Sequence, residues 1–264
     1  MISVEQLELT FNPNTAMETK ALRGITLTIP PGQFVTVIGS NGAGKSTLLK
    51  AISGDVSCDR GSVSIGDRAV TRWSAPRRAK LVARVFQDPL AGSCADLTIA
   101  ENMALAYRRG RWRSLAFGVT PGMMVEFRSH VSRLNLGLEN RLGDRMGLLS
   151  GGQRQAVSLL MATLAPRKIL LLDEHTAALD PKTAAYVAKL TREIVEEQQL
   201  TTLMVTHSMR QALDLGDRTL MLHEGQVVFD VAGEERSRLD VPDLLRMFEE
   251  VRGEELANDS LLLS

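Results

Sequence analysis

The sequence has few cysteines, no excess of charge of either sign and no long hydrophobic run. Its two cysteines, Cys58 and Cys94, have no neighbour at metal-ligand spacing and are too few for a disulfide framework. We therefore expect inert thiols in a reducing compartment. Lysine plus arginine total 31, as do aspartate plus glutamate, so the overall charge does not favour nucleic acid as a partner. The longest apolar uncharged stretch, 156–166, is about half of the roughly 20 residues that cross a bilayer, so we expect no membrane span.

An export signal, an internal repeat and a low-complexity tract are also lacking. Residues 1–5 are not a basic segment followed by an apolar run, so nothing marks this end for secretion. A length of 264 residues can hold one large domain or two small ones, and a hydrophobic content of 44% is ordinary for a packed globular core. We expect one domain to span residues 1–251 and a polar tail to follow over residues 252–264.

Apolar and polar residues alternate in two N-terminal segments, 4–11 and 22–29, which predicts a pair of antiparallel strands. A β-branched run at 33–38 then leads into a glycine-rich loop and a helix expected at 46–52. The other elements expected in this half are strands at 62–65 and 81–86 and a short helix that begins within 73–78.

The hydrophobic pattern changes after Pro89. From about residue 97 to residue 164 the apolar residues recur at helical spacing, so we predict an inserted helical subdomain over residues 91–164. Strands then alternate with helices, as in a parallel sheet with crossover connections, so the sheet core and a β-subdomain would occupy 1–90 and 165–235. The expected strands are 168–172, 202–206, 219–222 and 226–231, and the expected helices are 182–198, 209–215 and 241–251.

Residues 39–46, Gly-Ser-Asn-Gly-Ala-Gly-Lys-Ser, match all eight positions of a phosphate-binding loop. Glycines let backbone N–H groups surround a phosphate, and the following helix presents its positive N-terminal end to the same charge. Lys45 is expected to reach the β- and γ-phosphates of ATP, and the Ser46 hydroxyl to bind Mg²⁺. A glycine-rich turn without a ligand is disfavoured by the full match. The ATP-binding candidates here are Ser40, Asn41, Gly42, Ala43, Gly44, Lys45, Ser46 and Thr47.

Two adjacent carboxylates, Asp173 and Glu174, end a strongly hydrophobic strand. A buried parallel strand delivers its last residues to the edge of the sheet where ligands bind. Asp173 is therefore expected to hold Mg²⁺ through water, and Glu174 to polarise the water that attacks the phosphate. The alternative is a solvated turn.

Two further polar residues follow predicted strands. Gln87 lies where the helical insertion begins, so its neutral amide could contact Mg²⁺ or water. His207 follows strand 202–206, and its imidazole could reach the γ-phosphate. Each could also be an ordinary strand-end residue. The remaining histidines, which we expect to be structural or superficial, are His130, His175 and His223.

Residues 149–153, Leu-Ser-Gly-Gly-Gln, open a predicted helix at 154–164. Ser150 is a good helix cap, and Gly151, Gly152 and Gln153 complete a helix N-terminus that favours an anion. A helix cap needs no ligand, which is the simpler alternative.

The ordered set of phosphate loop, residues 149–153 and Asp173-Glu174 resembles the ATP-binding cassette (ABC) family. The resemblance covers residues 1 to about 250. It implies an α/β fold of the P-loop NTPase, RecA-like type, with a parallel sheet core, an antiparallel β-subdomain and an inserted α-helical subdomain. It further implies that residues 149–153 meet the γ-phosphate bound to a second cassette. In the family, residues like Gln87 and His207 act as the hinge between subdomains and as the switch histidine.

Two more site residues come from this resemblance. Asp180, in Ala178-Leu179-Asp180, resembles the loop that couples the two sites of the dimer. Phe11 stands near the position of the family's adenine-stacking aromatic residue, although a core phenylalanine is the alternative. His175 departs from the family, whose commonest members have proline after the catalytic glutamate, and this puts the local loop conformation in question.

Residues 10–13, 84–89 and 172–183 look like those of bacterial import-system ATPases. That resemblance implies a homodimer bound to an integral-membrane permease at the inner, cytoplasmic face of the cell membrane, and indirectly an extracytoplasmic substrate-binding protein. Some members take aromatic amino acids. The helical insertion would dock the permease, and the basic residues 108–113 would face lipid headgroups or the permease, or form a solvated loop.

A soluble cassette ATPase that acts on a protein assembly, such as iron–sulfur cluster construction, would share every ATP motif and remains the alternative. DNA-repair cassettes would need a long coiled coil, for which the roughly sixty residues between Gln87 and Ser150 leave no room. A translation-factor cassette would need two tandem copies. A nucleotide sensor would be favoured by lost catalytic residues, and none is missing.

Overall fold

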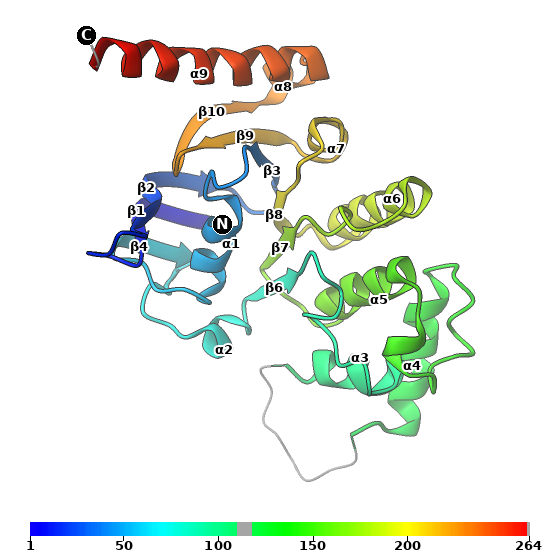
Figure 1. Cartoon of the computed structure of the whole chain (residues 1–264). Helices are drawn as coiled ribbons and strands as arrows, with labels where there is room; N and C mark the ends of the chain where they lie inside the picture. The colour runs from blue at the N-terminus through cyan, green and yellow to red at the C-terminus, as the bar shows by residue number, and fades with distance from the viewer. Residues whose placement is uncertain (110–117, 263–264) are drawn as a thin grey trace.

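The strand patterns form two β-sheets in the computed structural model, which describes residues 1–109 and 118–262 (Figure 1). The first sheet is antiparallel, in the order β2-β1-β4-β5, and the second has the order β10-β9-β3-β8-β7-β6. The first sheet comprises β1 (Ile2–Phe11), β2 (Thr19–Ile29), β4 (Arg60–Ile65) and β5 (Arg68–Ala69). The second comprises β3 (Phe34–Gly39), β6 (Val82–Val85), β7 (Ile169–Asp173), β8 (Thr201–Val205), β9 (Arg218–His223) and β10 (Gln226–Ala232).

The second sheet is parallel from β9 through β6, and only β10 runs antiparallel. Strands β3, β7, β8 and β9 are short runs of mostly buried residues, as expected for strands covered on both faces. Parallel alignment brings the carboxyl ends of β3, β6, β7 and β8 to one edge. The phosphate loop, Gln87, Asp173 and His207 follow these four ends, so the fold gathers at one edge residues that are far apart in the sequence.

The helices fall into two groups. One group accompanies the sheets and consists of α1 (Lys45–Ser53), α2 (Ala75–Arg78), α6 (Pro181–Gln198), α7 (Met209–Leu215), α8 (Gly233–Ser237) and α9 (Val241–Leu262). The other is the insertion between β6 and β7, which contains α3 (Ile99–Tyr107), α4 (Pro121–Ser132), the short 3₁₀ helix η1 (Met146–Leu148) and α5 (Gly151–Thr163). No helix within the described ranges is long and apolar enough to cross a membrane.

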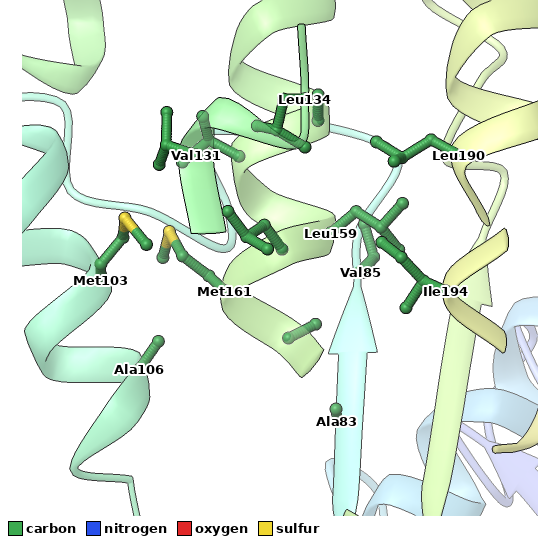
Figure 2. Packing of buried hydrophobic residues seen from close by; sticks show 14 of the residues in the cluster. Ala83, Val85, Met103, Ala106, Val131, Leu134, Leu159, Met161, Leu190 and Ile194 are labelled. Carbon is green, nitrogen blue, oxygen red and sulfur yellow. The ribbon is translucent and has the colours of Figure 1, made fainter. Parts of the chain in front are cut away.

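Helix α5 joins the inserted helices to the sheet. One continuous hydrophobic cluster contains side chains of β6, α3, α5 and α6, and Figure 2 shows them meeting around α5. A second cluster fills the space around α1 between the two sheets. Each fully buried aliphatic side chain contributes about 1.5–3 kcal/mol relative to an exposed one. The insertion is therefore packed onto the core through α5. The labelled residues are Ala83, Val85, Met103, Ala106, Val131, Leu134, Leu159, Met161, Leu190 and Ile194.

The predicted fold class is confirmed, but several predicted bounds differ from those in the structure, and two of these differences have a clear physical reason. The strand expected at 81–86 ends at Val85, because the Phe86 carbonyl accepts a hydrogen bond from Gln155 Nε2 of α5 instead of continuing the ladder with β7. The C-terminal helix does not end at residue 251 but continues to Leu262 in place of a tail. Gly253 lies inside this helix, where one glycine costs only about 1 kcal/mol relative to alanine.

Candidate functional site

The phosphate loop joins β3 to α1. Gly44 caps α1 with a φ of 94°, and a Cβ at this position would lie 2.4 Å from the Ala21 carbonyl oxygen, so only glycine fits. No side chain caps the N-terminus of α1. Its first backbone N–H groups are therefore available to an anion, and the helix dipole adds to their positive potential.

Lys45 begins α1 and is 5% exposed. Its Nζ donates to the Gly39 carbonyl oxygen at 2.9 Å and to the Ser40 carbonyl oxygen at 2.8 Å, so the ammonium lies across the loop. Burial lowers the pKa of Lys45, and the nearby carboxylates of Glu174 and Asp173 oppose that shift. The ammonium thus belongs to the same cluster as the two carboxylates at the end of β7.

Ser46 and Asp173 converge from α1 and β7. Ser46 Oγ donates to Asp173 Oδ1 at 2.9 Å. Neighbouring ligands of an octahedral Mg²⁺ with bonds of about 2.1 Å are about 3 Å apart, so these two oxygens fit such an ion. No group of three or more His, Cys, Asp or Glu side chains within the described ranges could hold a metal by itself. The pair fits Mg²⁺, a cation that proteins bind through one or two carboxylates, with substrate phosphate and water in most of the remaining positions.

Glu174 and His207 meet at the same edge. Glu174 Oε1 lies 2.7 Å from His207 Nε2, and the two side chains are 10% and 45% exposed, respectively. Glu174 has a φ of 46°, a left-handed conformation that is costly for a residue with a side chain, while its N–H donates to the Val205 carbonyl oxygen. The pair borders an open cleft of about 330 Å³, further lined by Thr176, Ala177, Thr206, Ser208 and Gln211. A carboxylate and an imidazole thus face a space that a small polar substrate could enter.

The loop after Glu174 is anchored by His175. His175 is fully buried, and its Nε2 lies 2.9 Å from Thr191 Oγ1 on α6. The Thr191 hydroxyl donates to the Val187 carbonyl oxygen, so it accepts from an Nε2–H of the imidazole. Burial lowers the pKa of His175 to about 4, so the ring is neutral at pH 7. His175 is structural, as expected, and a residue other than proline here leaves the left-handed Glu174 without a pre-proline restriction.

Gln211 connects the loop after β7 to the loop after β8. Its Oε1 accepts from Thr176 Oγ1 at 2.9 Å and from Thr206 Oγ1 at 3.2 Å. Thr176 follows Glu174 by two residues, and Thr206 precedes His207. One amide oxygen therefore fixes the spacing of the segments that carry the carboxylate and the imidazole.

Residues 149–153 form a helix start whose own side chains already cap it. Ser150 Oγ accepts from the Gln153 N–H at 3.2 Å, and Gln153 Oε1 accepts from the Ser150 N–H at 3.1 Å. A Cβ on Gly152 would lie 2.0 Å from Thr183 Cγ2 of α6, whereas one on Gly151 would meet nothing nearer than 3.8 Å. Gly152 is thus required by packing within the chain, and Gly151 is open to solvent.

The other predicted residues lie as follows. Gln87 is exposed just past β6, at the start of the insertion. Phe11 ends β1 with 38% of its surface exposed, so the alternative of a core phenylalanine is wrong. Asp180 caps α6 by accepting from the Thr183 N–H at 3.1 Å, and hydrogen bonds from Thr183 lower the pKa of Asp180. Of the basic run 108–113, only the first two residues lie within the described part of the chain.

The sequence analysis missed three residues that contact the predicted site. Arg84, Gln155 and Gln211 contact Asp173, the Phe86 carbonyl and the loop after Glu174, respectively. One signal was present: an arginine inside an apolar strand next to the strand of Asp173 needs a buried partner. The two glutamines look like surface residues of amphipathic helices, so the sequence holds no signal for them.

Comparisons with known proteins give one family. The family model described as ABC transporter matches residues 22–177. The sequence is 42% identical over 254 residues to the tyrosine transport ATP-binding protein of Clostridioides difficile, which covers 94% of this chain and 99% of that relative. It is 36% identical over 240 residues to the phosphonates import ATP-binding protein PhnC of Chromohalobacter salexigens, covering 88% and 84% of the two chains.

Solved structures agree with the sequence relatives. The fold matches the ATP-binding cassette MJ0796, solved as a dimer in a post-hydrolysis state bound to ADP and Pi, with a TM-score of 0.76 and 27% identity. The match covers 88% of this chain and 98% of that one. The same α/β architecture is thus found in a chain that pairs with a second copy when it handles nucleotide.

Proposed function

Because the chain belongs to the ABC transporter family and is an ATPase of that family, we propose that it drives an importer as one of two ATP-binding subunits. The observation that carries this proposal is the edge of the parallel sheet. Lys45, Ser46, Asp173, Glu174 and His207 gather there, whereas residues 149–153 begin a different helix. One chain therefore supplies a phosphate site with its hydrolytic groups, and a second chain would supply the other wall.

Each residue of the phosphate half has a proposed role toward ATP. Backbone N–H groups of residues 40–47 surround the β-phosphate, and Lys45 leaves the loop carbonyls to pair with the β- and γ-phosphates. Phe11 is half exposed at the end of β1 and stacks on adenine. Ser46, Asp173 and Gln87 would hold Mg²⁺, which when bound neutralises charge on the phosphates.

Hydrolysis is assigned to Glu174. Its carboxylate accepts a hydrogen bond from the attacking water and takes the proton as the water oxygen bonds to the γ-phosphorus and the bond to the β-phosphate oxygen breaks. His207 lies 2.7 Å from Glu174 and orients this carboxylate while it contacts the γ-phosphate. Gln211 keeps the two loops at this spacing through the hydroxyls of Thr176 and Thr206.

The second subunit completes the site. Ser150, Gly151, Gly152 and Gln153 contact the γ-phosphate held by the partner copy, and Asp180 lies at the coupling loop between the two sites. ATP binding then closes the dimer, and hydrolysis opens it, because the closed state binds ATP more tightly than the open one. We further propose that residues 91–164 move as one helical subdomain of a single domain spanning residues 1–251.

An integral-membrane permease is the proposed partner of the helical subdomain. Leu105 on α3 and Val125 on α4 are 62% and 70% exposed, which suits a contact surface for a cytoplasmic helix of a permease. In this proposal the chain works at the inner face of the cell membrane, and a substrate-binding protein acts on the far side. The protein-assembly alternative is not favoured, since curated relatives are import ATP-binding subunits.

For the cargo we propose an aromatic amino acid. This rests on the name of the tyrosine transport relative, which matches over 94% of this chain. Cargo contacts the permease and the binding protein and not the cassette, so uptake of labelled tyrosine by cells with and without the gene is the direct test. Equal uptake in both strains contradicts this assignment and leaves the ATPase role untouched.

Purification from native membranes in mild detergent tests the importer proposal. A tagged wild-type chain should recover a polytopic membrane protein. Val125→Glu should lose that protein, while the control Val228→Glu, on β10 at 38% exposure, should retain it. Recovery of soluble assembly proteins alone would contradict the proposal.

A further inference from the structure

Arg84 is a buried cation next to the nucleotide site to which no sequence motif assigns a role. Its side chain is 9% exposed and bridges two carboxylates. Nη2 donates to Asp173 Oδ2 and Nη1 donates to Asp55 Oδ2, each at 2.6 Å. A cation this buried is stable only when it is paired. The two carboxylates are therefore what keep Arg84 inside the protein.

Asp173 has both carboxylate oxygens engaged by donors of its own chain. Oδ1 accepts from Ser46 at 2.9 Å, and Oδ2 accepts from Arg84 at 2.6 Å. Ser46 and Asp173 are also the residues proposed to hold Mg²⁺. Two cations beside one carboxylate repel each other, so Mg²⁺ at this carboxylate must weaken the pair with Arg84.

We propose that Arg84 is a positioning residue that occupies Asp173 until Mg²⁺ and ATP arrive, and so sets how strongly ATP binding depends on Mg²⁺. Without nucleotide, Arg84 offsets the negative charge of Asp173. With Mg²⁺ in place, the same guanidinium competes for Asp173. The inference rests on the proposed role of Asp173 in holding Mg²⁺.

Asp55 gives Arg84 a second anchor when its pair with Asp173 weakens. Asp55 follows α1, the helix that begins at the phosphate loop, and its side chain is 40% exposed. The guanidinium carbon also lies 4.7 Å from the centre of the Phe86 ring, one residue before Gln87. Within the described part of the chain Arg84 Nε has no hydrogen-bond partner, so carboxylates and a ring hold the guanidinium. When the pair between Arg84 and Asp173 weakens, the guanidinium can therefore move against Phe86 and alter the position of Gln87.

The experiment compares wild type with Arg84→Met in the full-length chain. Calorimetric titration with the non-hydrolysable β,γ-imido analogue of ATP is carried out once in excess Mg²⁺ and once in EDTA. In EDTA the variant leaves Asp173 without its guanidinium partner near the triphosphate, so affinity for the ATP analogue falls. In Mg²⁺ the Arg84 guanidinium no longer competes with the metal for Asp173, so affinity for the ATP analogue is kept or rises. We expect the ratio of the two affinities to increase about tenfold over wild type.

Arg218→Met is the matched control. Arg218 is 16% exposed and its Nε donates to Asp230 Oδ1 at 2.6 Å on the β9–β10 hairpin, so the variant also breaks a shielded ion pair. The ratio of its affinities for the ATP analogue in Mg²⁺ and in EDTA should equal that of wild type. Thermal unfolding establishes that both variants fold. A wild-type ratio in folded Arg84→Met overturns the inference. A wild-type chain whose affinity does not depend on Mg²⁺ would instead overturn the proposed metal site.

Asp55→Asn keeps the test decisive if Arg84→Met does not fold. In this variant Asp173 is the one carboxylate among the described residues that still pairs with Arg84. The guanidinium should therefore let go of Asp173 less readily when Mg²⁺ binds. The affinity ratio should then fall about threefold, the effect of a partly exposed ion pair. An unchanged or higher ratio would contradict the competition between Arg84 and Mg²⁺.

Discussion

Two helix N-termini of this chain are suited to phosphate, and they differ in what they leave free. Helix α1 begins at Gly44 without a side-chain cap, with Lys45 and the carboxylates of β7 beside it. Helix α5 begins at Ser150 with a complete capping box, and Ser150 and Gly151 are exposed. The first is built to hold an anion within its own chain. The second has its first backbone N–H groups capped by its own side chains, and its exposed surface is available to another molecule.

Because of this difference, we expect the two motifs to tolerate different substitutions. At the start of α1, Ala43, Gly44 and Lys45 are buried and Ser46 donates to Asp173, so these residues, proposed to bind phosphate and metal, are also packed. At the start of α5, packing and the proposed function rest on different residues. Gly152 is needed for packing on Thr183, whereas a Cβ on Gly151 would meet no atom nearer than 3.8 Å. Substitutions at these positions can therefore test the two halves of the proposed site one at a time.

The largest expected effect is that of Glu174→Gln on the α1 side. The amide keeps the size of the side chain and cannot take a proton, so phosphate release should fall by about 10²–10⁴-fold while ATP still binds. Phosphate release and size-exclusion chromatography with ATP check both parts, and an ATP-dependent dimer should accumulate. Rapid hydrolysis by this variant would remove Glu174 from the role of general base.

Lys45→Ala and Gly151→Asp separate nucleotide binding from pairing. Loss of the Lys45 ammonium should weaken ATP affinity about 100-fold, because two charge-assisted contacts to phosphate disappear.

Gly151→Asp puts a carboxylate at the start of α5, where a helix tolerates it, and opposite the partner's γ-phosphate. Its ATP affinity as a monomer should match wild type, while ATP-driven dimerisation is lost. Equal losses of affinity in the two variants would contradict the division between α1 and α5.

Gly152→Ala tests whether α5 packs on α6 as described. The added methyl group would overlap Thr183 Cγ2, so the free energy of unfolding should fall by about 1–3 kcal/mol. Thr183→Ser removes that methyl group, keeps the hydroxyl and should restore most of the loss in the double variant. Chemical denaturation of the four proteins gives the comparison, and purely additive effects would argue against the contact.

His175 lies in the loop after Glu174 and should give a pH-dependent stability. Its pKa in the folded chain, about 4, lies below the unfolded value of 6.5, so protonation favours the unfolded state. The cost is absent above pH 6.5 and grows as the pH falls toward 4. Between pH 7 and pH 5 wild type should lose about 2 kcal/mol more than His175→Gln, which cannot titrate. Parallel denaturation curves over this range would contradict the burial of a neutral imidazole.

Sequence reasoning predicted most of this architecture because the strands are short apolar runs separated by strong turn signals. It placed Asp173, Glu174 and His207 at strand ends, and parallel pairing brings strand ends together whatever the details of packing. It could not predict contacts made by long side chains across elements. Arg84, Gln155 and Gln211 act over many residues of sequence separation, and their partners are set by register and packing. The end of the last helix was missed because a single glycine is a weak stop signal.

The central claim is that the α1 side of one chain works with the α5 side of another. Mixing Glu174→Gln with Gly151→Asp tests it, because each variant alone lacks one half of every site. Each mixed dimer has one intact composite site, formed by the α1 side of the Gly151→Asp chain and the α5 side of the Glu174→Gln chain, so the mixture should hydrolyse ATP well above the average of the two separate variants. If the mixture hydrolyses ATP no faster than the average of the two separate variants, the two halves do not act across a dimer.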